Sequence, residues 1–174
     1  NANNGGFTAA GSPWEHGSSP YGPGNCNGGS GSCWGMNIDG EYDACQEGTL
    51  TSPAIDLSHC AGKSIEVSFY TWYYFESGCY DGYAVEYLDT GGSWRLVTPN
   101  EGYTDTLRPY GCGGGAYLDG KAALCNSDET WRRKTVTLPS GAYNPSFQFR
   151  FVSDVDESGY YSGAYIDDFE VSAP

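Results

Sequence analysis

The chain has 174 residues, 39% of them hydrophobic, and 22 acidic residues against 8 basic ones give it a formal net charge of −14. This length suits one domain, residues 1–174, with a substantial core, and no apolar run is long enough to cross a bilayer. The negative charge and the lack of a basic stripe argue against nucleic acid as a partner, because phosphates would be repelled. Divalent cations and neutral ligands fit this charge better.

The composition also favours strands and an oxidising compartment. The chain has 26 Gly, 15 Tyr and 5 Trp, and aromatic residues favour pleated surfaces whereas strong helix formers are scarce here. Seven cysteines predict a secreted, extracellular protein. Because the sequence begins Asn-Ala-Asn-Asn without Met or a signal sequence, we expect a piece of a larger secreted protein. Other domains of a larger secreted enzyme are candidate partners, and we expect the chain to be a monomer.

Short runs of alternating apolar and polar residues predict strands along the whole chain. They start near Phe7 and continue at residues 33–38, 50–58 (an edge strand broken by Pro53), 64–75, 83–88, 94–98, 131–138, 147–154 and 163–171. The strands at 64–75 and 83–88 are expected to form a hairpin, and residues 99–130 a long loop excursion. Regular strands without intervening helices predict an antiparallel β-sandwich of the jelly-roll kind with long, disulfide-linked loops.

The cysteines are expected to close local loops. The simplest pairing joins Cys26 to Cys33, Cys45 to Cys60 and Cys112 to Cys125, and it leaves Cys79 over. Cys79 lies at the tip of the predicted hairpin, so it could instead reach the excursion and pair with Cys112 or Cys125.

Carboxylates at strand ends predict a structural calcium site. Strand alternation places Asp167 on one face with Tyr165, Phe169 and Val171, where a charge must be neutralised by a cation, by Arg150 or by backbone N–H groups. Residues 154–159 also match the first half of an oxygen-rich calcium loop, although the twelfth position is Tyr165 rather than Glu, so this is no EF-hand. The predicted ligands are Glu76, Asp81, Asp154, Asp156, Asp167 and Asp168. The alternative is that these carboxylates are solvated or paired within the protein.

Aromatic residues predict a sugar-binding surface. Tyr70, Trp72 and Tyr74 share the non-core face of the longest strand, and Trp and Tyr rings stack on the C–H faces of sugars. Other tyrosines come from the excursion and from the acidic turn, so that the predicted ligand-binding set is Tyr70, Trp72, Tyr74, Tyr110, Tyr117, Tyr160 and Tyr161, with Tyr103 nearby. The alternative is that the N-terminal segment or the excursion covers these rings, which would make them a second core.

Several of these segments together resemble the MAM domain and MAM-like modules of secreted, probably bacterial, proteins. The resemblance covers about residues 33–171 and rests on residues 50–58, 69–76, Asp81, 91–94, Trp131, 149–154 and 163–168. It implies a jelly roll related to concanavalin-A-like lectins, a non-catalytic recognition role and structural calcium. We therefore predict a non-catalytic carbohydrate-binding module, with a protein-interaction or adhesion module as the alternative.

A glycoside hydrolase is the third alternative. Glu41, Asp43 and Glu47 resemble the Glu, Asp and Glu of laminarinase-like jelly rolls, but the two Glu are six residues apart. At ~3.3 Å per strand residue this spacing is too long for paired carboxylates, which lie ~5–10 Å apart. No Ser, His and Asp triad is evident, and His16 and His59 have no partner at zinc-ligand spacing. No catalytic residue is predicted.

Overall fold

The computed structural model describes residues 4–11, 13–18, 20–109, 111–113 and 116–173. Within these residues it has twelve strands, three short 3-10 helices and no α-helix, and so no helix there is long and apolar enough to span a membrane. The strands are β1 (Thr8–Gly11), β2 (Trp14–Gly17), β3 (Cys33–Met36), β4 (Glu47–Thr51), β5 (Glu66–Tyr74), β6 (Gly82–Leu88), β7 (Trp94–Leu96), β8 (Asp105–Thr106), β9 (Ala122–Cys125), β10 (Ser127–Thr137), β11 (Phe149–Asp154) and β12 (Gly163–Ser172). The 3-10 helices are Asn27–Gly29, Ser58–Cys60 and Ser140–Ala142.

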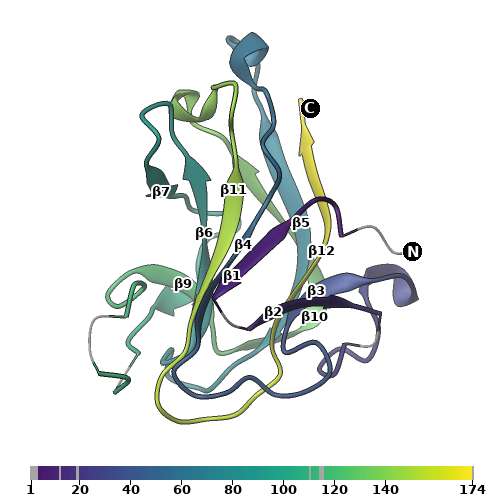
Figure 1. Cartoon of the computed structure of the whole chain (residues 1–174), viewed down its shortest axis with the longest axis vertical. Coiled ribbons are helices and arrows are strands. Elements are labelled where there is room, and N and C mark those ends of the chain that lie inside the picture. The colour runs from purple at the N-terminus through teal and green to yellow at the C-terminus, as the bar shows by residue number, and fades with distance from the viewer. Residues whose placement is uncertain (1–3, 12, 19, 110, 114–115, 174) are drawn as a thin grey trace.

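The strands form two antiparallel sheets that face each other (Figure 1). One sheet has the order β1-β4-β11-β6-β9-β8, with β7 beside β6, and the other has the order β10-β5-β12-β3-β2. The predicted sandwich is confirmed. The predicted hairpin is wrong, because β5 and β6 belong to different sheets and the turn between them crosses the sandwich. The predicted edge strand at 50–58 is also wrong: β4 ends at Thr51 and lies between β1 and β11.

The core lies between the sheets and follows the predicted alternation. Phe149 and Phe151 of β11 meet Phe69 of β5 with ring centroids 6.2 and 4.9 Å apart, and all three side chains are fully buried. Trp14 of β2 also belongs to this core, and its ring centroid lies 6.3 Å from that of Phe151. Truncating a ring of this kind to Ala removes about 3–5 kcal/mol of stability.

The excursion is part of the fold rather than an open loop. It contributes β8 and β9 to the first sheet, and β10 already begins at Ser127. Leu107 and Leu118 pack against Ala84 and Val152 to form a second, smaller core on the outer face of that sheet. The excursion therefore covers part of the outer face of the first sheet.

Three disulfides join the described cysteines, and two of them differ from the simplest pairing. Cys26–Cys33 is confirmed, and so is the alternative bond from Cys79 to Cys125. Cys45 pairs with Cys112 rather than Cys60, and Cys60 is free. The two long-range bonds span 67 and 46 residues, because the excursion folds back onto the start of β4 and onto the turn before β6. Proximity in sequence was the wrong criterion, since only Cα atoms about 4.4–6.8 Å apart can be bridged.

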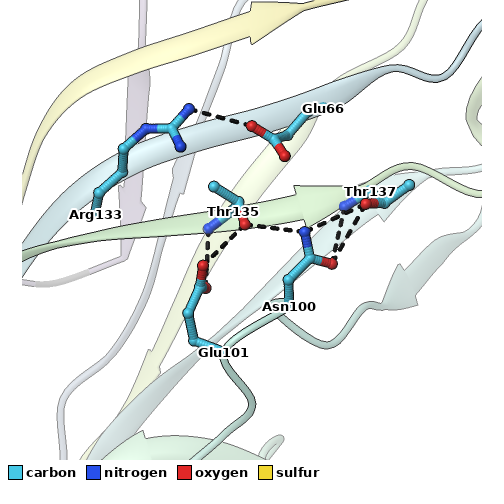
Figure 2. A network of polar contacts seen from close by, with 6 residues as sticks. All are labelled: Glu66, Asn100, Glu101, Arg133, Thr135 and Thr137. Atoms are coloured by element: carbon cyan, nitrogen blue, oxygen red, sulfur yellow. Dashed lines mark hydrogen bonds and ion pairs between the residues drawn. The ribbon is translucent and has the colours of Figure 1, made fainter. Parts of the chain in front are cut away.

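A network of polar side chains covers the free edge of β10, the outermost strand of the second sheet (Figure 2). The Glu101 carboxylate accepts hydrogen bonds from the backbone N–H and the hydroxyl of Thr135 at 3.0 and 2.9 Å. The Asn100 amide donates to the hydroxyls of Thr135 and Thr137 at 2.9 and 3.2 Å. These side chains occupy donors that an open edge would offer to another strand.

Candidate cation and ligand site

Three carboxylates converge where strands of both sheets end. Glu76 follows β5, Asp81 precedes β6 and Asp156 follows β11, and one oxygen of each lies within 4.8 Å of the others. The β11–β12 segment that carries Asp156 runs around the lower end of the sandwich (Figure 1). No lysine or arginine in the described part of the chain forms an ion pair with any of the three.

Asp81 lies at the centre of this carboxylate cluster and is fully buried. Its Oδ2 accepts a 2.5 Å hydrogen bond from the Tyr42 hydroxyl, and its Oδ1 accepts one of 2.7 Å from the Asp156 backbone N–H. Burial raises the pKa of Asp81 to about 7, and the nearby charges of Asp156 and Glu76 act in the same direction. The same burial and the Asp81 charge raise the pKa of Tyr42, which holds its proton for this bond.

Glu76 completes the cluster with an unsatisfied oxygen. Its Oε2 is buried and has no hydrogen-bond partner among the described residues. Burial, followed by repulsion from Asp156, raises the pKa of Glu76. A Cβ at Gly159 would lie 2.9 Å from this oxygen and 3.1 Å from the Tyr161 ring, and Gly159 has φ +82°. The chain therefore comes close to Glu76 at a residue that must be glycine.

This arrangement provides hard oxygen donors around an uncompensated negative charge. Buried carboxylates must bind a proton, a donor or a cation. Calcium takes six to eight oxygens from carboxylates, carbonyls and water, so these residues fit its chemistry. The residues could hold such an ion with Glu76, Asp81 and Asp156 as its charged ligands.

The other three predicted ligands, Asp154, Asp167 and Asp168, lie outside this cluster. Asp154 is buried and accepts a 2.7 Å hydrogen bond from the Leu118 N–H; burial raises its pKa to about 6, and the neighbouring Glu47 contributes. Asp167 lies beside the Cys26–Cys33 disulfide, whose sulfurs are not available as ligands. Asp168 is exposed next to it. Arg150, the alternative partner of Asp167, instead binds Glu86 at 2.6 Å.

The aromatic residues predicted to bind sugar do not form one surface. Trp72 is only 5% exposed: its ring packs edge-on against Tyr165, and the loop at Gly22 lies so close that a Cβ there would be 2.6 Å from the indole. The stacking platform predicted at Trp72 is therefore covered by the N-terminal segment, which was the alternative interpretation. Tyr70, on the same strand, is half-buried, and Tyr110 lies outside the described residues.

A tyrosine surface lies beside the carboxylate cluster. Tyr74 is 37% exposed and Tyr160 57%, and the rings of Tyr74 and Tyr161 meet edge to face with centroids 5.1 Å apart. Tyr74 and Tyr161 line a hollow of about 150 Å³ together with Phe75, Ser77, Asn126 and Ser127. Tyr161 also lies over Gly159, which connects this surface to Glu76. The tyrosine surface (Tyr74, Tyr160 and Tyr161) thus combines rings with polar groups.

The exposed Tyr117 lies elsewhere, on the outer face of the first sheet. Its hydroxyl donates to Glu86 at 2.6 Å, and the Lys121 ammonium lies 3.3 Å above its ring. Arg150 stacks on Trp94 at 4.2 Å. Tyr117 and Arg150 line a hollow of about 350 Å³. This hollow shares no lining residue with the hollow at the tyrosine surface.

Sequence reasoning missed several residues of these sites. Tyr42 lies between Glu41 and Asp43, which the sequence pattern made candidates for a hydrolase site while Tyr42 itself was not considered. Neither Glu41 nor Asp43 lies in a strand. Asn126 and Ser127 follow β9 and meet Tyr74 only because β10 pairs with β5. No local pattern marks such long-range neighbours.

Comparisons with known proteins define the fold. No family model matches this sequence, and no curated protein matches it. Among solved structures, the K1 cleaved adhesin domain of Lys-gingipain from Porphyromonas gingivalis W83 has a TM-score of 0.56 at 20% identity, over 97% of this chain and 90% of that one. The K2 cleaved adhesin domain of Lys-gingipain has 0.52 at 16%, over 96% and 90%. A structure of carbohydrate-binding modules from the β-sandwich superfamily has 0.50 at 14%, over 98% and 58%.

These similarities identify the class of fold. The chain is a β-sandwich of the kind found in adhesin and carbohydrate-binding modules. At such low identity the fold alone carries over, and function must be argued from the site.

Proposed function

We propose that this domain is an extracellular, non-catalytic carbohydrate-binding module that holds a neutral glycan on its tyrosine surface. The observation that carries the proposal is the pair formed by the exposed Tyr74 and the half-buried Tyr161, beside the amide of Asn126 and the hydroxyls of Ser77 and Ser127. Rings supply stacking area and the polar groups supply hydrogen bonds to sugar hydroxyls. The three disulfides support an oxidising, extracellular location. The MAM-like resemblance of the sequence is part of the same proposal, because such modules are non-catalytic recognition units.

Calcium at Glu76, Asp81 and Asp156 is the second part of the proposal. The unpartnered Glu76 Oε2 and the fully buried Asp81 support it. The ion would fix the turn at residues 156–161, because Asp156 and Gly159 touch the cluster while Tyr160 and Tyr161 follow directly. Calcium would then act on glycan affinity by ordering the tyrosine surface.

The ion can be tested directly with terbium. Tb³⁺ has oxygen preferences like those of calcium, and tyrosine excites its emission at short range. We expect emission that rises on Tb³⁺ addition, falls when excess calcium competes, and drops sharply in Tyr42→Phe, because Tyr42 contacts Asp81. Equal emission from an Asp81→Asn variant would contradict the site.

The glycan is tested by an array of neutral polysaccharides probed with and without a chelator. Retention at micromolar to millimolar dissociation constants, about −4 to −8 kcal/mol, is expected for a shallow site. Tyr161→Ala should abolish it, whereas Tyr117→Ala on the other face should leave it intact. If Tyr117→Ala abolished retention and Tyr161→Ala did not, the glycan would instead bind in the hollow lined by Tyr117 and Arg150.

A protein-interaction or adhesion module is the second candidate, favoured by the fold shared with the two adhesin domains. It predicts that no polysaccharide on the array is retained. Hydrolysis has less support. The predicted pattern requires Glu41, Asp43 and Glu47 on one strand face, but only Glu47 lies in a strand.

A further inference from the structure

A hollow of about 440 Å³ opens beside β3 and β12 and has no part in the proposed glycan site. Its lining includes the large apolar side chains of Phe7, Trp34, Ile55, Phe169 and Val171. Two carboxylates, Asp167 and Asp168, and the His16 ring also line it, and no lysine or arginine does. An apolar wall next to two uncompensated negative charges is unusual for a surface that meets only water.

A β-bulge turns both carboxylates toward this hollow. The register of β12 against β5 shifts between Asp167 and Glu170, and Asp168 adopts φ +48°. Strict alternation, which would have placed Asp167 with Phe169 on the core face, is interrupted at this point. A bulge re-aims side chains in this way.

Neutral donors hold the two carboxylates in place. Asp167 accepts hydrogen bonds from the backbone N–H of Asn27 at 3.0 Å and of Asp168 at 2.8 Å. The Asn27 amide donates to Asp168 at 2.8 Å, and the adjacent Cys26–Cys33 disulfide fixes the loop that carries Asn27. These contacts fix geometry and leave the charge uncompensated. Within the described chain neither carboxylate has an ion-pair partner.

The aromatic wall is equally fixed. Phe7 meets Phe169 edge to face at 5.1 Å and Trp34 at 6.5 Å, and the Trp34 indole N–H donates to the Asn4 carbonyl. His16 lies 5.1 Å from Trp34, and burial lowers its pKa, which favours the neutral imidazole. The Phe7, Trp34 and Phe169 rings thus line the same hollow as Asp167 and Asp168, and aromatic rings attract cations.

We propose that this hollow receives a lysine side chain of a partner protein, with the methylene stem along the rings and the ammonium between Asp167 and Asp168. A lysine stem lies well on apolar surface while its ammonium keeps polar contacts. Lysine suits two neighbouring carboxylates better than arginine, because a compact ammonium can lie between them whereas the planar arginine fork matches both oxygens of one carboxylate. The net charge of −14 would speed the approach of a basic partner.

The experiment uses the whole chain and two matched peptides. Acetyl-Gly-Lys-Gly-amide is titrated into ¹⁵N-labelled protein, and its norleucine analogue keeps the stem but lacks the ammonium. We expect the lysine peptide to shift the Trp34 indole signal and the amides of residues 167–169, with the norleucine peptide about tenfold weaker. Asp168→Asn should weaken lysine binding about fivefold. This variant should fold, because the side chain is exposed and Asn tolerates positive φ.

Asp119→Asn is the control, since it removes one exposed charge away from the hollow and should leave binding unchanged. The proposal is overturned if norleucine binds as tightly as lysine, because the hollow is then merely apolar. It is also overturned if Asp119→Asn weakens binding as much as Asp168→Asn, or if a glucosamine oligomer shifts the same signals at lower concentration than the peptide. None of these outcomes depends on Tyr74 or Tyr161, so failure here is distinct from failure of the glycan site.

Discussion

Two groups of carboxylates in this domain lack a lysine or arginine partner among the described residues, and they differ in how they meet their surroundings. Glu76, Asp81 and Asp156 come from three strand ends and converge within 4.8 Å. Asp167 and Asp168 are chain neighbours that face one side of an aromatic hollow. Convergence in a buried space suits a metal ion with many oxygen ligands, whereas a one-sided arrangement next to rings suits an organic cation. Residue type alone therefore does not determine the ligand.

The largest difference between the two groups should be seen as a dependence of stability on pH. The folded pKa of Asp81 is about 7, above its ordinary 3.8, so its protonated form stabilises the fold below pH 4 and this contribution is lost as pH rises through 7. Without calcium, the free energy of unfolding should fall by up to about 4 kcal/mol over this range. Urea titrations at several pH values measure it.

Asp154 contributes in the same direction, since its pKa is raised to about 6. Asp81→Asn should therefore remove the fall between pH 6 and 7 and leave only the Asp154 contribution between pH 4 and 6, while Asp168→Asn should leave the fall between pH 6 and 7 in place. A pH profile that Asp81→Asn does not alter would show that the buried carboxylate is already neutralised in another way.

Calcium should act on the first group only. An ion that binds the native state at 100 times its dissociation constant adds about 2.7 kcal/mol, which for a domain of this size raises the melting temperature by roughly 5–10 °C. Because calcium competes with the Asp81 proton, the increase should be larger at pH 8 than at pH 5. Scanning calorimetry with calcium and with chelator measures the shift. Loss of the shift in Asp168→Asn, or its survival in Asp81→Asn, would reverse our assignment of the site.

The sequence predicted the sandwich, its core and the three carboxylates that converge in the cluster, because strand alternation and strand ends are local properties. Glu76, Asp81 and Asp156 were all predicted by their position directly after or before a strand. Asp167 was included by strict alternation, and that argument failed because a bulge at Asp168 interrupts the strand. A bulge has no reliable local signature, so the separate hollow could not be predicted.

Long-range pairing limited the rest of the prediction. Trp72 has the pattern of an exposed platform, but the loop at Gly22 covers it from more than forty residues away. Cys79 and Cys125 meet because β6 and β9 are neighbours in the first sheet. Both facts depend on which strands pair, and alternation within one strand contains no information about its neighbours.

Gly159 connects the first group to the tyrosine surface, and its substitution should have an intermediate effect. Gly159→Ala introduces a Cβ at φ +82°, 2.9 Å from Glu76 Oε2, so strain and crowding should together cost about 2 kcal/mol. Gly92→Ala is the matched control: it has φ +76° with no atom within 4 Å of the added Cβ, so only backbone strain of about 1 kcal/mol is expected. Chemical denaturation measures both. Equal losses would mean that Glu76 can move freely away from the turn.

The smallest effect should come from the second group, where Asp168→Asn is expected to change the free energy of unfolding by less than about 0.5 kcal/mol. The side chain is exposed, an amide oxygen can still accept from Asn27, and Asn is well suited to the φ of +48°. Losing one charge also relieves repulsion with Asp167, whose pKa is raised by burial and by the Asp168 charge. The same variant should nevertheless weaken lysine binding, and this separation of stability from binding distinguishes a ligand site from a structural one. A loss of 2 kcal/mol in a urea titration would instead make Asp168 part of the framework of the bulge.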